Sequence, residues 1–408
     1  MDMAKPIIRF KGYQDDWEQR KLSELLVERN VQHSQSEEFP LVSFTVENGV
    51  TPKTERYERE QLVRGDKSAK KYKETRLDDI VYNPANLKFG AISRNKLGNA
   101  VFSPIYVTFE VKKDLVKPSF IEMVVTRKNF IQKALQYQQG TVYERMAVNT
   151  EDFTNLDVYI PNGFEQEKIG NYFENLDNLI TLHQRKCDET KKLKKYMLQK
   201  MFPQNGEKVP EIRFSGFTDD WEQRKLEDIA EFSKGSGYSK GDLIESGTPI
   251  ILYGRLYTKY ETSISEVDTY VEAKDGSVYS KGGEVIVPAS GETAEDIARA
   301  ATVDKSGVIL GGDLNVVSPN EDINSAFLAI SISHGNSQRE LAKKAQGKSV
   351  VHIHNEEIKN LVVPFPANAE QNKIVEYFSN LDHLITLHQR ELENLQNIKK
   401  FMLGKMFV

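Results

Sequence analysis

An internal duplication constrains this chain more than any other feature of its sequence. The stretch from Arg9 to Leu22 returns about 204 residues later as the stretch from Arg213 to Leu226, and both copies end in Asp-Asp-Trp-Glu-Gln-Arg-Lys-Leu. A longer stretch, residues 165–202, returns as residues 370–407 with roughly 23 of 38 positions identical. A repeat at a fixed distance indicates that one structural unit is built twice. Each half is a divergent body of about 155 residues followed by a nearly constant tail of about 40.

The constant tails have the spacing of long amphipathic helices. Steps of four and three residues connect mainly apolar side chains along each tail, and such sustained spacing is typical of a coiled coil. The positions that we assign to the helix–helix and partner interface are Ile169, Phe173, Leu176, Ile180, His183 and Met197, followed by Ile374, Phe378, Leu381, Ile385, His388 and Met402. Each helix alone would leave an apolar stripe in water, so we expect the two to pack together. We expect antiparallel packing, because a molecule with one body at each end requires it.

Two histidines, His183 and His388, occupy equivalent positions of this seam. Imidazoles in a seam could bind a metal or act as a proton switch. We interpret them instead as polar layers, which fix the register and direction of a coiled coil at some cost in stability. A helix of 38 residues with ~1.5 Å per residue is ~57 Å long, so the paired helices would act as a spacer between the bodies.

The duplication and the helix signals divide the chain into five segments. They are an N-terminal domain (1–163), a first long helix (164–202), a linker (203–212), a C-terminal domain (213–368) and a second long helix (369–408). Short strand and turn signals dominate both bodies, with helices expected over residues 120–137 and 325–333. We predict an α+β fold: two α/β-mixed domains separated by two long helices that form an antiparallel coiled coil, with a pseudo-two-fold internal repeat.

Composition places the chain among soluble globular proteins. Hydrophobic residues make up 39% of the chain and charged residues 28%, and no apolar run approaches the ~20 residues that a membrane span needs. Residues 1–6 do not resemble a signal peptide, so we expect a cytoplasmic protein with no membrane contact. The single cysteine, Cys187, excludes an internal disulfide and a thiolate cluster for zinc.

Charge is distributed unevenly between the bodies. Residues 7–163 contain 24 Lys+Arg and 22 Asp+Glu, a net charge of +2, whereas residues 211–368 contain 16 and 25, a net charge of −9. Phosphate contacts from Lys and Arg supply most nonspecific affinity for DNA, so the second body alone is not a strong nonspecific DNA binder. Basic residues nevertheless cluster with aromatic residues in both bodies, and both bodies contain a Gln-Gly dipeptide, at residues 139–140 and 346–347.

Several short strings that resemble catalytic motifs are incomplete. Residues 83–86, Asn-Pro-Ala-Asn, lack the second proline and the aromatic residue of the adenine methyltransferase motif. Residues 347–349, Gly-Lys-Ser, match the end of a phosphate loop, but Ala342 stands where its first glycine should be. His352 and His354 could share one strand face, yet a third metal ligand is not evident. We therefore expect no catalytic residue, metal or cofactor on this chain.

The duplicated pattern resembles the specificity (S) subunits of type I restriction–modification systems over essentially the whole chain. The resemblance is carried by the Arg-Phe-x-Gly…Asp-Asp-Trp-Glu-Gln-Arg-Lys-Leu openings, by the Glu-Gln-x-Lys-Ile…Leu-Asp-x-Leu-Ile-Thr-Leu-His-Gln-Arg helices and by the two Gln-Gly turns. It implies two target recognition domains, each reading one half of a bipartite, asymmetric sequence in double-stranded DNA. It also implies that the helices set the spacer and dock two modification (adenine methyltransferase) subunits that carry S-adenosylmethionine. Separate restriction subunits would use ATP and Mg²⁺ to translocate and cut DNA.

DNA contacts cannot be assigned by motif in the divergent bodies, so we select candidates by chemistry. Lys and Arg can bond guanine edges or phosphates, and Gln can read adenine. The candidates are Lys70, Lys71, Tyr72, Lys73, Lys88, Arg94, Gln139, Tyr143 and Arg145, and Tyr238, Arg255, Tyr257, Lys259, Lys344, Gln346 and Lys348. One alternative is an enzyme that acts unaided, which would require a catalytic constellation that is not evident. The other is a coiled-coil scaffold that joins two protein- or sugar-binding heads.

Overall fold

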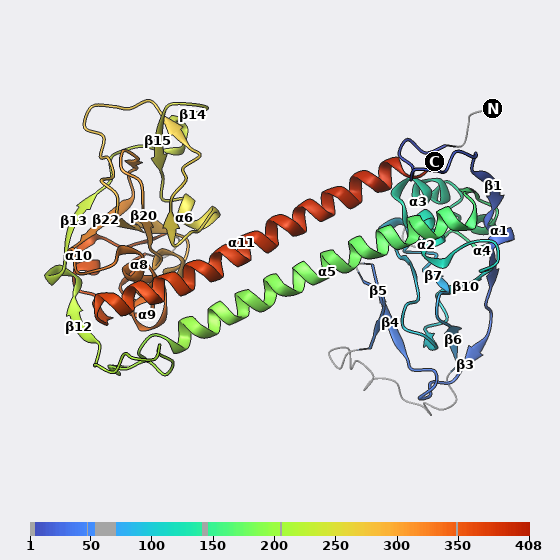
Figure 1. The fold of residues 1–408 in the computed structure, drawn as a ribbon, viewed down its shortest axis with the longest axis horizontal. Coiled ribbons are helices and arrows are strands. Elements are labelled where there is room, and N and C mark those ends of the chain that lie inside the picture. The colour runs from blue at the N-terminus through green and yellow to red at the C-terminus, as the bar shows by residue number, and fades with distance from the viewer. Residues whose placement is uncertain (1–4, 47, 54–70, 141–145, 205, 348–349) are drawn as a thin grey trace. The chain divides into compact units, whose positions relative to one another are not determined.

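The chain forms two compact units, which Figure 1 shows in a computed structural model of residues 5–46, 48–53, 71–140, 146–204, 206–347 and 350–408. The first unit comprises Met1–Gln184 and Arg390–Val408, and the second comprises Arg185–Gln389. The two longest helices each contribute to both units, because α5 spans Gly163–Lys200 and α11 spans Asn368–Lys405. No helix in the described part of the chain combines the length and the apolar character needed to cross a membrane.

In the first unit, the start of α5 packs against the end of α11. The ring of Phe173 lies 5.8 Å from the ring of Phe407. Farther along α5, Asp177 forms an ion pair with Lys399, which precedes Phe407 in the chain. Moving forward along α5 therefore means moving backward along α11, so the two helices are antiparallel in this unit.

The second unit repeats this arrangement with the roles of the helices exchanged. The ring of Phe378, in the first part of α11, lies 6.3 Å from the ring of Phe202, which follows α5. Asp382, farther along α11, forms an ion pair with Lys194 at 2.5 Å. The predicted antiparallel packing is confirmed in both units. The predicted seam positions are all buried or partly buried in the structure, which explains their 3–4 spacing.

The first body is built from short antiparallel strands and short helices. Its strands are β1 (Glu18–Lys21), β2 (Leu26–Glu28), β3 (Gln32–His33), β4 (Val42–Thr45), β5 (Gly49–Pro52), β6 (Tyr72–Thr75), β7 (Ile80–Tyr82), β8 (Ile92–Arg94), β9 (Ala100–Phe102), β10 (Val107–Val111) and β11 (Asp157–Ile160). Its helices are α1 (Leu22–Leu25), α2 (Pro118–Thr126), α3 (Lys128–Leu135) and α4 (Thr150–Thr154), with a 3-10 turn at Leu87–Phe89. The sheets have the orders β2-β10-β7-β8, β3-β6-β9 and β4-β5.

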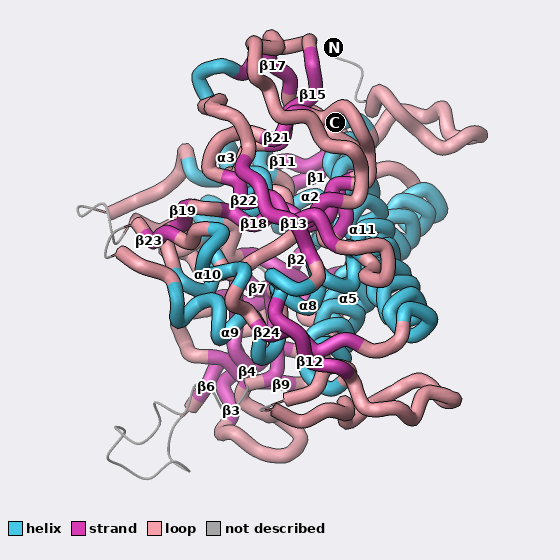
Figure 2. Tube along the Cα trace, turned by 90° about the vertical axis from the view of Figure 1, so that its left-hand side faces the viewer, coloured by secondary structure: helices cyan, strands magenta, loops and turns pink. Residues whose placement is uncertain are grey.

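The second body has a larger central sheet. Its strands are β12 (Glu222–Lys225), β13 (Ala230–Lys234), β14 (Leu243–Ile244), β15 (Thr248–Ile251), β16 (Ser263–Ile264), β17 (Tyr270–Val271), β18 (Glu284–Pro288), β19 (Ser290–Gly291), β20 (Ala301–Val303), β21 (Ile309–Leu310), β22 (Leu314–Pro319), β23 (Val351–His352) and β24 (Val362–Phe365). Its helices are α6 (Arg255–Thr258), α7 (Ala294–Ile297), α8 (Ser325–Ser333), α9 (Gly335–Lys344) and α10 (Asn355–Lys359), with 3-10 turns at Leu226–Asp228 and Lys240–Asp242. The five-stranded sheet has the order β13-β22-β18-β20-β16, and a second sheet the order β14-β17-β15-β21; Figure 2 shows β13, β22 and β18 side by side.

Each body is attached to its long helix by the same two-stranded pairing. In the first unit, β1 of the duplicated opening pairs with β11, which directly precedes α5, and Glu18 lies opposite Ile160. In the second unit, β12 pairs with β24, which directly precedes α11, and Glu222 lies opposite Phe365. The two duplicated segments of each half are thus neighbours in space, although a divergent body separates them in sequence.

The helix predicted over residues 120–137 is wrong as a single element. The structure has two helices there, α2 and α3, because Arg127 between them is extended with φ −65° and ψ 140°. The Arg127 guanidinium donates to the carbonyl oxygen of Val408 and stacks 4.8 Å from the Phe407 ring centroid. These contacts with the end of α11 stabilise the break, which the apolar pattern of the sequence does not reveal.

Candidate nucleic-acid interface

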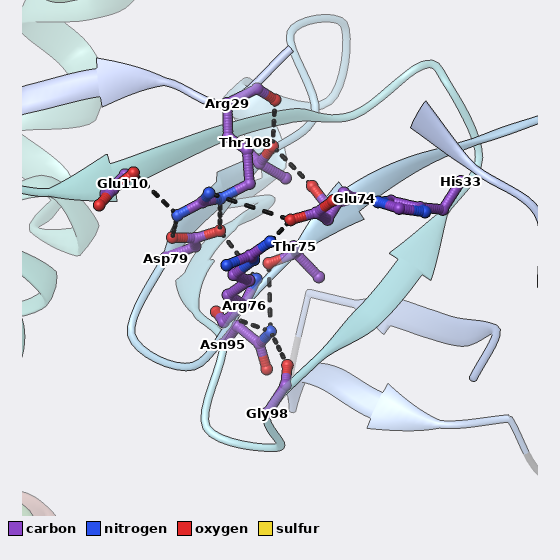
Figure 3. Close-up of polar contacts among 10 residues, drawn as sticks. All are labelled: Arg29, His33, Glu74, Thr75, Arg76, Asp79, Asn95, Gly98, Thr108 and Glu110. Atoms are coloured by element: carbon purple, nitrogen blue, oxygen red, sulfur yellow. Dashed lines mark hydrogen bonds and ion pairs between the residues drawn. The ribbon is translucent and has the colours of Figure 1, made fainter. Parts of the chain in front are cut away.

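A dense network of charged side chains lies around β6 in the first body (Figure 3). Its centre is Glu74, whose side chain is fully buried. The Glu74 Oε1 accepts a hydrogen bond from Arg76 Nε at 2.6 Å and lies 3.9 Å from Arg29 Nη1. The other carboxylate oxygen, Oε2, lies 2.6 Å from His33 Nε2. A single buried carboxylate therefore faces two cations and one imidazole ring, which offsets the cost of removing its charge from water.

A second buried carboxylate, Asp79, supports the same network. Arg29 donates to it twice, from Nε at 2.8 Å and from Nη2 at 3.2 Å, and the backbone N–H of Arg76 donates to it at 2.8 Å. Burial raises the pKa of Asp79, and the hydrogen bonds from Arg29 and Arg76 oppose that rise. Arg29 also reaches Glu110 at 3.0 Å. The two arginines of the network, Arg29 and Arg76, are thus paired with carboxylates, as Figure 3 shows.

Two members of the network nevertheless face solvent. The side chain of Arg76 is 53% exposed and that of His33 is 41% exposed, although both contact the buried Glu74. The His33 ring also stacks on Phe39 at 4.4 Å with an interplanar angle of 6°. Fixed, exposed hydrogen-bond donors of this kind are suited to phosphates or base edges. Our sequence-based candidates omit both residues. Arg76 could have been included because it ends the basic run of Lys70, Lys71 and Lys73, whereas no signal in the sequence distinguishes His33.

Two first-body candidates, Lys73 and Arg94, are already neutralised inside the fold. Lys73 is 5% exposed, and its Nζ donates to Glu28 at 3.1 Å. Arg94 has an 11% exposed side chain, donates to Glu122 at 2.9 Å and also forms ion pairs with Asp78 and Glu174. A DNA phosphate would have to displace these carboxylates, so the observed geometry gives both cations a role in stabilising the body. Their DNA contacts stay a prediction.

Three other first-body candidates lie in the described part of the chain. Lys71 is exposed and donates to Ser34 Oγ at 3.3 Å, and Lys88 Nζ lies 5.1 Å from the centroid of the Phe89 ring. Tyr72 is partly buried on β6. Three further first-body candidates lie outside the residues that the structure describes; they are Lys70, Tyr143 and Arg145.

The two Gln-Gly dipeptides begin loops that are closed in the same way. In the first body, the backbone of Gln139 exchanges hydrogen bonds of 2.9 and 3.0 Å with Ala147. In the second, Gln346 exchanges hydrogen bonds of 3.1 and 2.8 Å with His352. The glycine is required at the second site, because Gly347 has a φ of 135° and an added Cβ would lie 1.9 Å from a backbone oxygen. Candidate Lys348 lies outside the described residues.

In the second body, Arg255 and Lys259 share the carboxylate of Asp268. Arg255 Nη1 donates to Asp268 at 2.7 Å, and Lys259 Nζ donates to it at 2.9 Å. The hydrogen bonds from Lys259 and Arg255 lower the pKa of Asp268 to about 2. The Arg255 side chain is only 8% exposed and also pairs with Glu261 at 2.8 Å. Arg255 therefore orders the loops around α6, and its DNA contact stays a prediction.

The tyrosine candidates of this body are also tied to its backbone. Tyr238 is 8% exposed, and its hydroxyl accepts a hydrogen bond from the Lys274 backbone N–H at 2.7 Å. The Tyr257 hydroxyl donates to the Ser290 carbonyl at 2.7 Å, and burial raises the pKa of Tyr257. Lys344 Nζ donates to a backbone carbonyl at 3.3 Å. All three side chains are thus hydrogen-bonded to the backbone of the second body.

Two hollows open on the surface of the second body around α6. One has a volume of about 600 Å³ and contains Leu243, Leu252 and Asp313 in its lining. The other has a volume of about 790 Å³ and contains Tyr257 and Arg299 in its lining. Within the described ranges, no group of three or more His, Cys, Asp or Glu side chains is arranged to hold a metal ion.

Comparisons with known proteins agree on one family. Residues 218–397 match the family model described as the type I restriction modification DNA specificity domain. The type I restriction enzyme MjaVIII specificity subunit of Methanocaldococcus jannaschii is 22% identical over 265 residues, which cover 62% of this chain and 61% of that protein. The putative MjaX specificity subunit of the same organism is 29% identical over 203 residues, 46% of each chain. The chain thus spans about three fifths or less of the length of these curated relatives.

The fold is also similar to that of a solved structure. The crystal structure of a type I restriction–modification system S subunit from M. genitalium matches with a TM-score of 0.58 and 14% sequence identity. The match covers 99% of both chains. At this level of identity the likeness concerns the fold alone, and it includes both bodies and both long helices.

Proposed function

We propose that this chain is a specificity subunit of a type I restriction–modification system, as its similarity to that family suggests. Each of its two bodies reads one half of a split sequence in double-stranded DNA. The chain itself carries no catalytic step. Two modification subunits supply S-adenosylmethionine and the adenine chemistry, and restriction subunits supply the ATP- and Mg²⁺-dependent cleavage.

The observation that carries the proposal is a set of contacts repeated around two different bodies. We call the duplicated opening and long helix of each half, which these contacts join, the frame. The bidentate pair of Arg9 with Glu165 recurs as Arg213 with Glu370, and the β1–β11 pairing recurs as β12–β24. Inside this frame the first body has a four-stranded main sheet and the second a five-stranded one. Duplicated attachment segments that carry two different bodies suit a protein that must read two different half-sites.

The charge of the second body supports a division of labour with partners. Its net charge is −9, and many of its described cations are paired with carboxylates, as Arg255 and Lys259 are. Nonspecific DNA affinity depends on free Lys and Arg at phosphates. We therefore expect the isolated chain to bind DNA weakly, with most phosphate contacts supplied by modification subunits.

Exposed apolar side chains at repeat-equivalent helix positions support two partner sites. In the first unit, Ile398 and Phe401 of α11 are 45% and 55% exposed. Their equivalents in the second unit, Leu193 and Tyr196 of α5, are 45% and 49% exposed. Exposed apolar residues outside the seam are suited to protein interfaces. Their duplication is what docking of two copies of one modification subunit requires.

Sequencing of methylated adenines, followed by footprinting, tests this function. A cell that carries the chain and its modification subunits should contain methylated adenines in one bipartite motif with a fixed gap. On a duplex with that motif, the assembled complex should protect two short blocks, and affinity should fall steeply with salt. A duplex with both blocks scrambled is the control. Tight specific binding by the lone chain, or methylation without a bipartite motif, would overturn the proposal.

A further inference from the structure

Four residues of the second body form a wall between its two hollows. Lys240, Tyr253, Gly254 and Thr258 line both the hollow of about 600 Å³ and the hollow of about 790 Å³. We call these residues the ridge. Lys240 begins the 3-10 turn at Lys240–Asp242, whereas Tyr253 and Gly254 directly precede α6 and Thr258 ends it; Figure 1 labels α6 beside β20. The ridge contains one aromatic ring, one cation and one glycine with nothing packed over it.

Tyr253 packs against Tyr257 on one side and is partly exposed to solvent on the other. Its side chain is 38% exposed, and its ring lies 6.2 Å from that of Tyr257 in an edge-on arrangement of 78°. Tyr257 in turn is anchored by its hydrogen bond to the Ser290 carbonyl. An aromatic side chain braced in this way presents apolar surface with little loss of conformational entropy on binding.

Lys240 differs from the cations around it. Arg255 and Lys259 are paired with Asp268, and Arg299 lies 3.3 Å from an oxygen of Asp296. Lys240 is exposed, and within the described part of the chain no ion pair joins its Nζ to a carboxylate. Its charge is therefore available to a ligand.

Asp242, two residues after Lys240, is already hydrogen-bonded to other groups. The Asp242 carboxylate accepts hydrogen bonds from Lys274 Nζ at 2.6 Å and from the backbone N–H of Ser239 at 2.8 Å. These contacts, with that from Lys274 the largest, lower the pKa of Asp242 to about 2. Asp242 thus fixes the turn that carries Lys240 without neutralising Lys240.

We infer that the ridge is the part of the second body that enters a groove of duplex DNA, with Tyr253 against base edges and Lys240 at a phosphate. This inference rests on the proposed function. A projecting ring can make apolar contact with base edges, including thymine methyl groups, and lysine binds phosphate as a point charge. The hollows themselves suit phosphates poorly, because Asp313 lines one and Glu292 the other. Neither Tyr253 nor Lys240 is among our sequence-based candidates.

Gly254 offers a test that does not disturb the fold. It has φ −60° and ψ −25°, which any L residue adopts, and an added Cβ would meet nothing within 4 Å. The matched variants are Gly254→Ala, Gly254→Glu and Gly254→Lys, in the full chain assembled with its modification subunits. The probes are a duplex with the motif found by methylated-adenine sequencing and duplexes with either half scrambled.

We expect the glutamate variant to bind the motif duplex at least about 10-fold more weakly than the alanine variant, because its carboxylate would face the DNA backbone. The lysine variant should bind at least as tightly as the alanine variant. Equal affinities of the glutamate and alanine variants would overturn the inference. Thermal unfolding of each complex confirms that the comparison is between folded proteins.

Two further substitutions separate base contact from phosphate contact. Tyr253→Ala should reduce discrimination at one or two base pairs of a single half-site by about 10-fold, with the other half-site unchanged. Lys240→Ala should weaken all sequences alike and lower the slope of log affinity against log salt by about 1. Lys281→Ala, an exposed cation that lines neither hollow, is the matched control.

The outcomes distinguish the inference from the function on which it rests. If the wild-type complex shows no bipartite recognition, the proposed function fails. If the wild-type complex recognises two half-sites but the Tyr253, Lys240 and Gly254 variants behave like it, the ridge is not at the DNA and only the inference fails. Tighter binding of a free nucleotide than of the motif duplex, lost in Tyr253→Ala, would assign the hollows to a small ligand and also overturn the inference.

Discussion

Arg9 and Glu165 form a bidentate ion pair, with Nε 2.6 Å from Oε1 and Nη2 2.7 Å from Oε2. Arg213 and Glu370 repeat it at 2.7 and 2.8 Å. The two glutamates are 0% and 1% exposed, so each pair joins the duplicated opening to the first turn of a long helix away from water. The duplicated opening and the duplicated helix are therefore two parts of one frame, which explains why both are repeated.

Arg9→Ala should destabilise the first unit strongly, because it leaves the buried Glu165 carboxylate without its partner. Breaking one side of a buried pair costs about 3–5 kcal/mol in the free energy of unfolding. Arg20→Ala is the matched control, since its partners Glu18 and Glu24 are exposed and such pairs contribute little to stability. Urea unfolding measures the free energy of unfolding of both variants. Similar losses would show that the Arg9–Glu165 pair contributes no more than an exposed pair.

The helix seam should depend on apolar packing more than on its ion pairs. Leu176 is 7% exposed within the core of the first unit, and Leu176→Ala should cost about 2–5 kcal/mol. Asp177 pairs with Lys399, but their side chains are 33% and 28% exposed, so Asp177→Ala should cost up to about 1 kcal/mol. A double-mutant cycle with Lys399→Ala measures the coupling directly. A coupling above the loss at Leu176 would contradict this ranking.

The frame and the seam could be predicted from the sequence because their signals are local or repeated. The 3–4 spacing around Ile169 and Phe173 is a property of one helix, and the duplicated Trp17 and Trp221 mark equivalent buried positions. Periodicity follows from helix geometry itself, so no tertiary information is needed to recognise it.

The roles of individual cations could not be predicted, because they depend on carboxylates far away in sequence. Arg94 pairs with Glu122 and Glu174, which lie 28 and 80 residues away along the chain. Nothing in the neighbourhood of Arg94 distinguishes it from a free cation such as Lys240. Only the folded structure shows which cations are neutralised, and that difference separates structural residues from candidate DNA contacts.

Glu74→Gln should destabilise the first body more than any change to its exposed partner. The substitution removes the buried charge that faces Arg29, Arg76 and His33, so the expected loss is about 3–5 kcal/mol. Arg76→Ala removes a side chain that is 53% exposed and should cost up to about 1 kcal/mol. Denaturant midpoints of the two variants provide the measurement. If Arg76→Ala lowered the free energy of unfolding more than Glu74→Gln does, the buried Glu74 charge would not be the centre of the network.

His334 should make the second unit less stable in mild acid. Burial, with smaller contributions from Lys194 and Arg299, lowers the pKa of His334 from 6.5 to about 4. Between these values the unfolded chain binds a proton that the folded chain does not, so the free energy of unfolding falls as pH decreases from about 6.5 toward 4. The contribution is fully present above the unfolded pKa and is on the order of 3 kcal/mol. His334→Gln, which is neutral throughout, should lose less stability than the wild type between pH 7.5 and pH 4.5 in urea unfolding. Carboxylates elsewhere titrate in both proteins, so the difference isolates His334; identical pH profiles would show that His334 is protonated without cost in the fold.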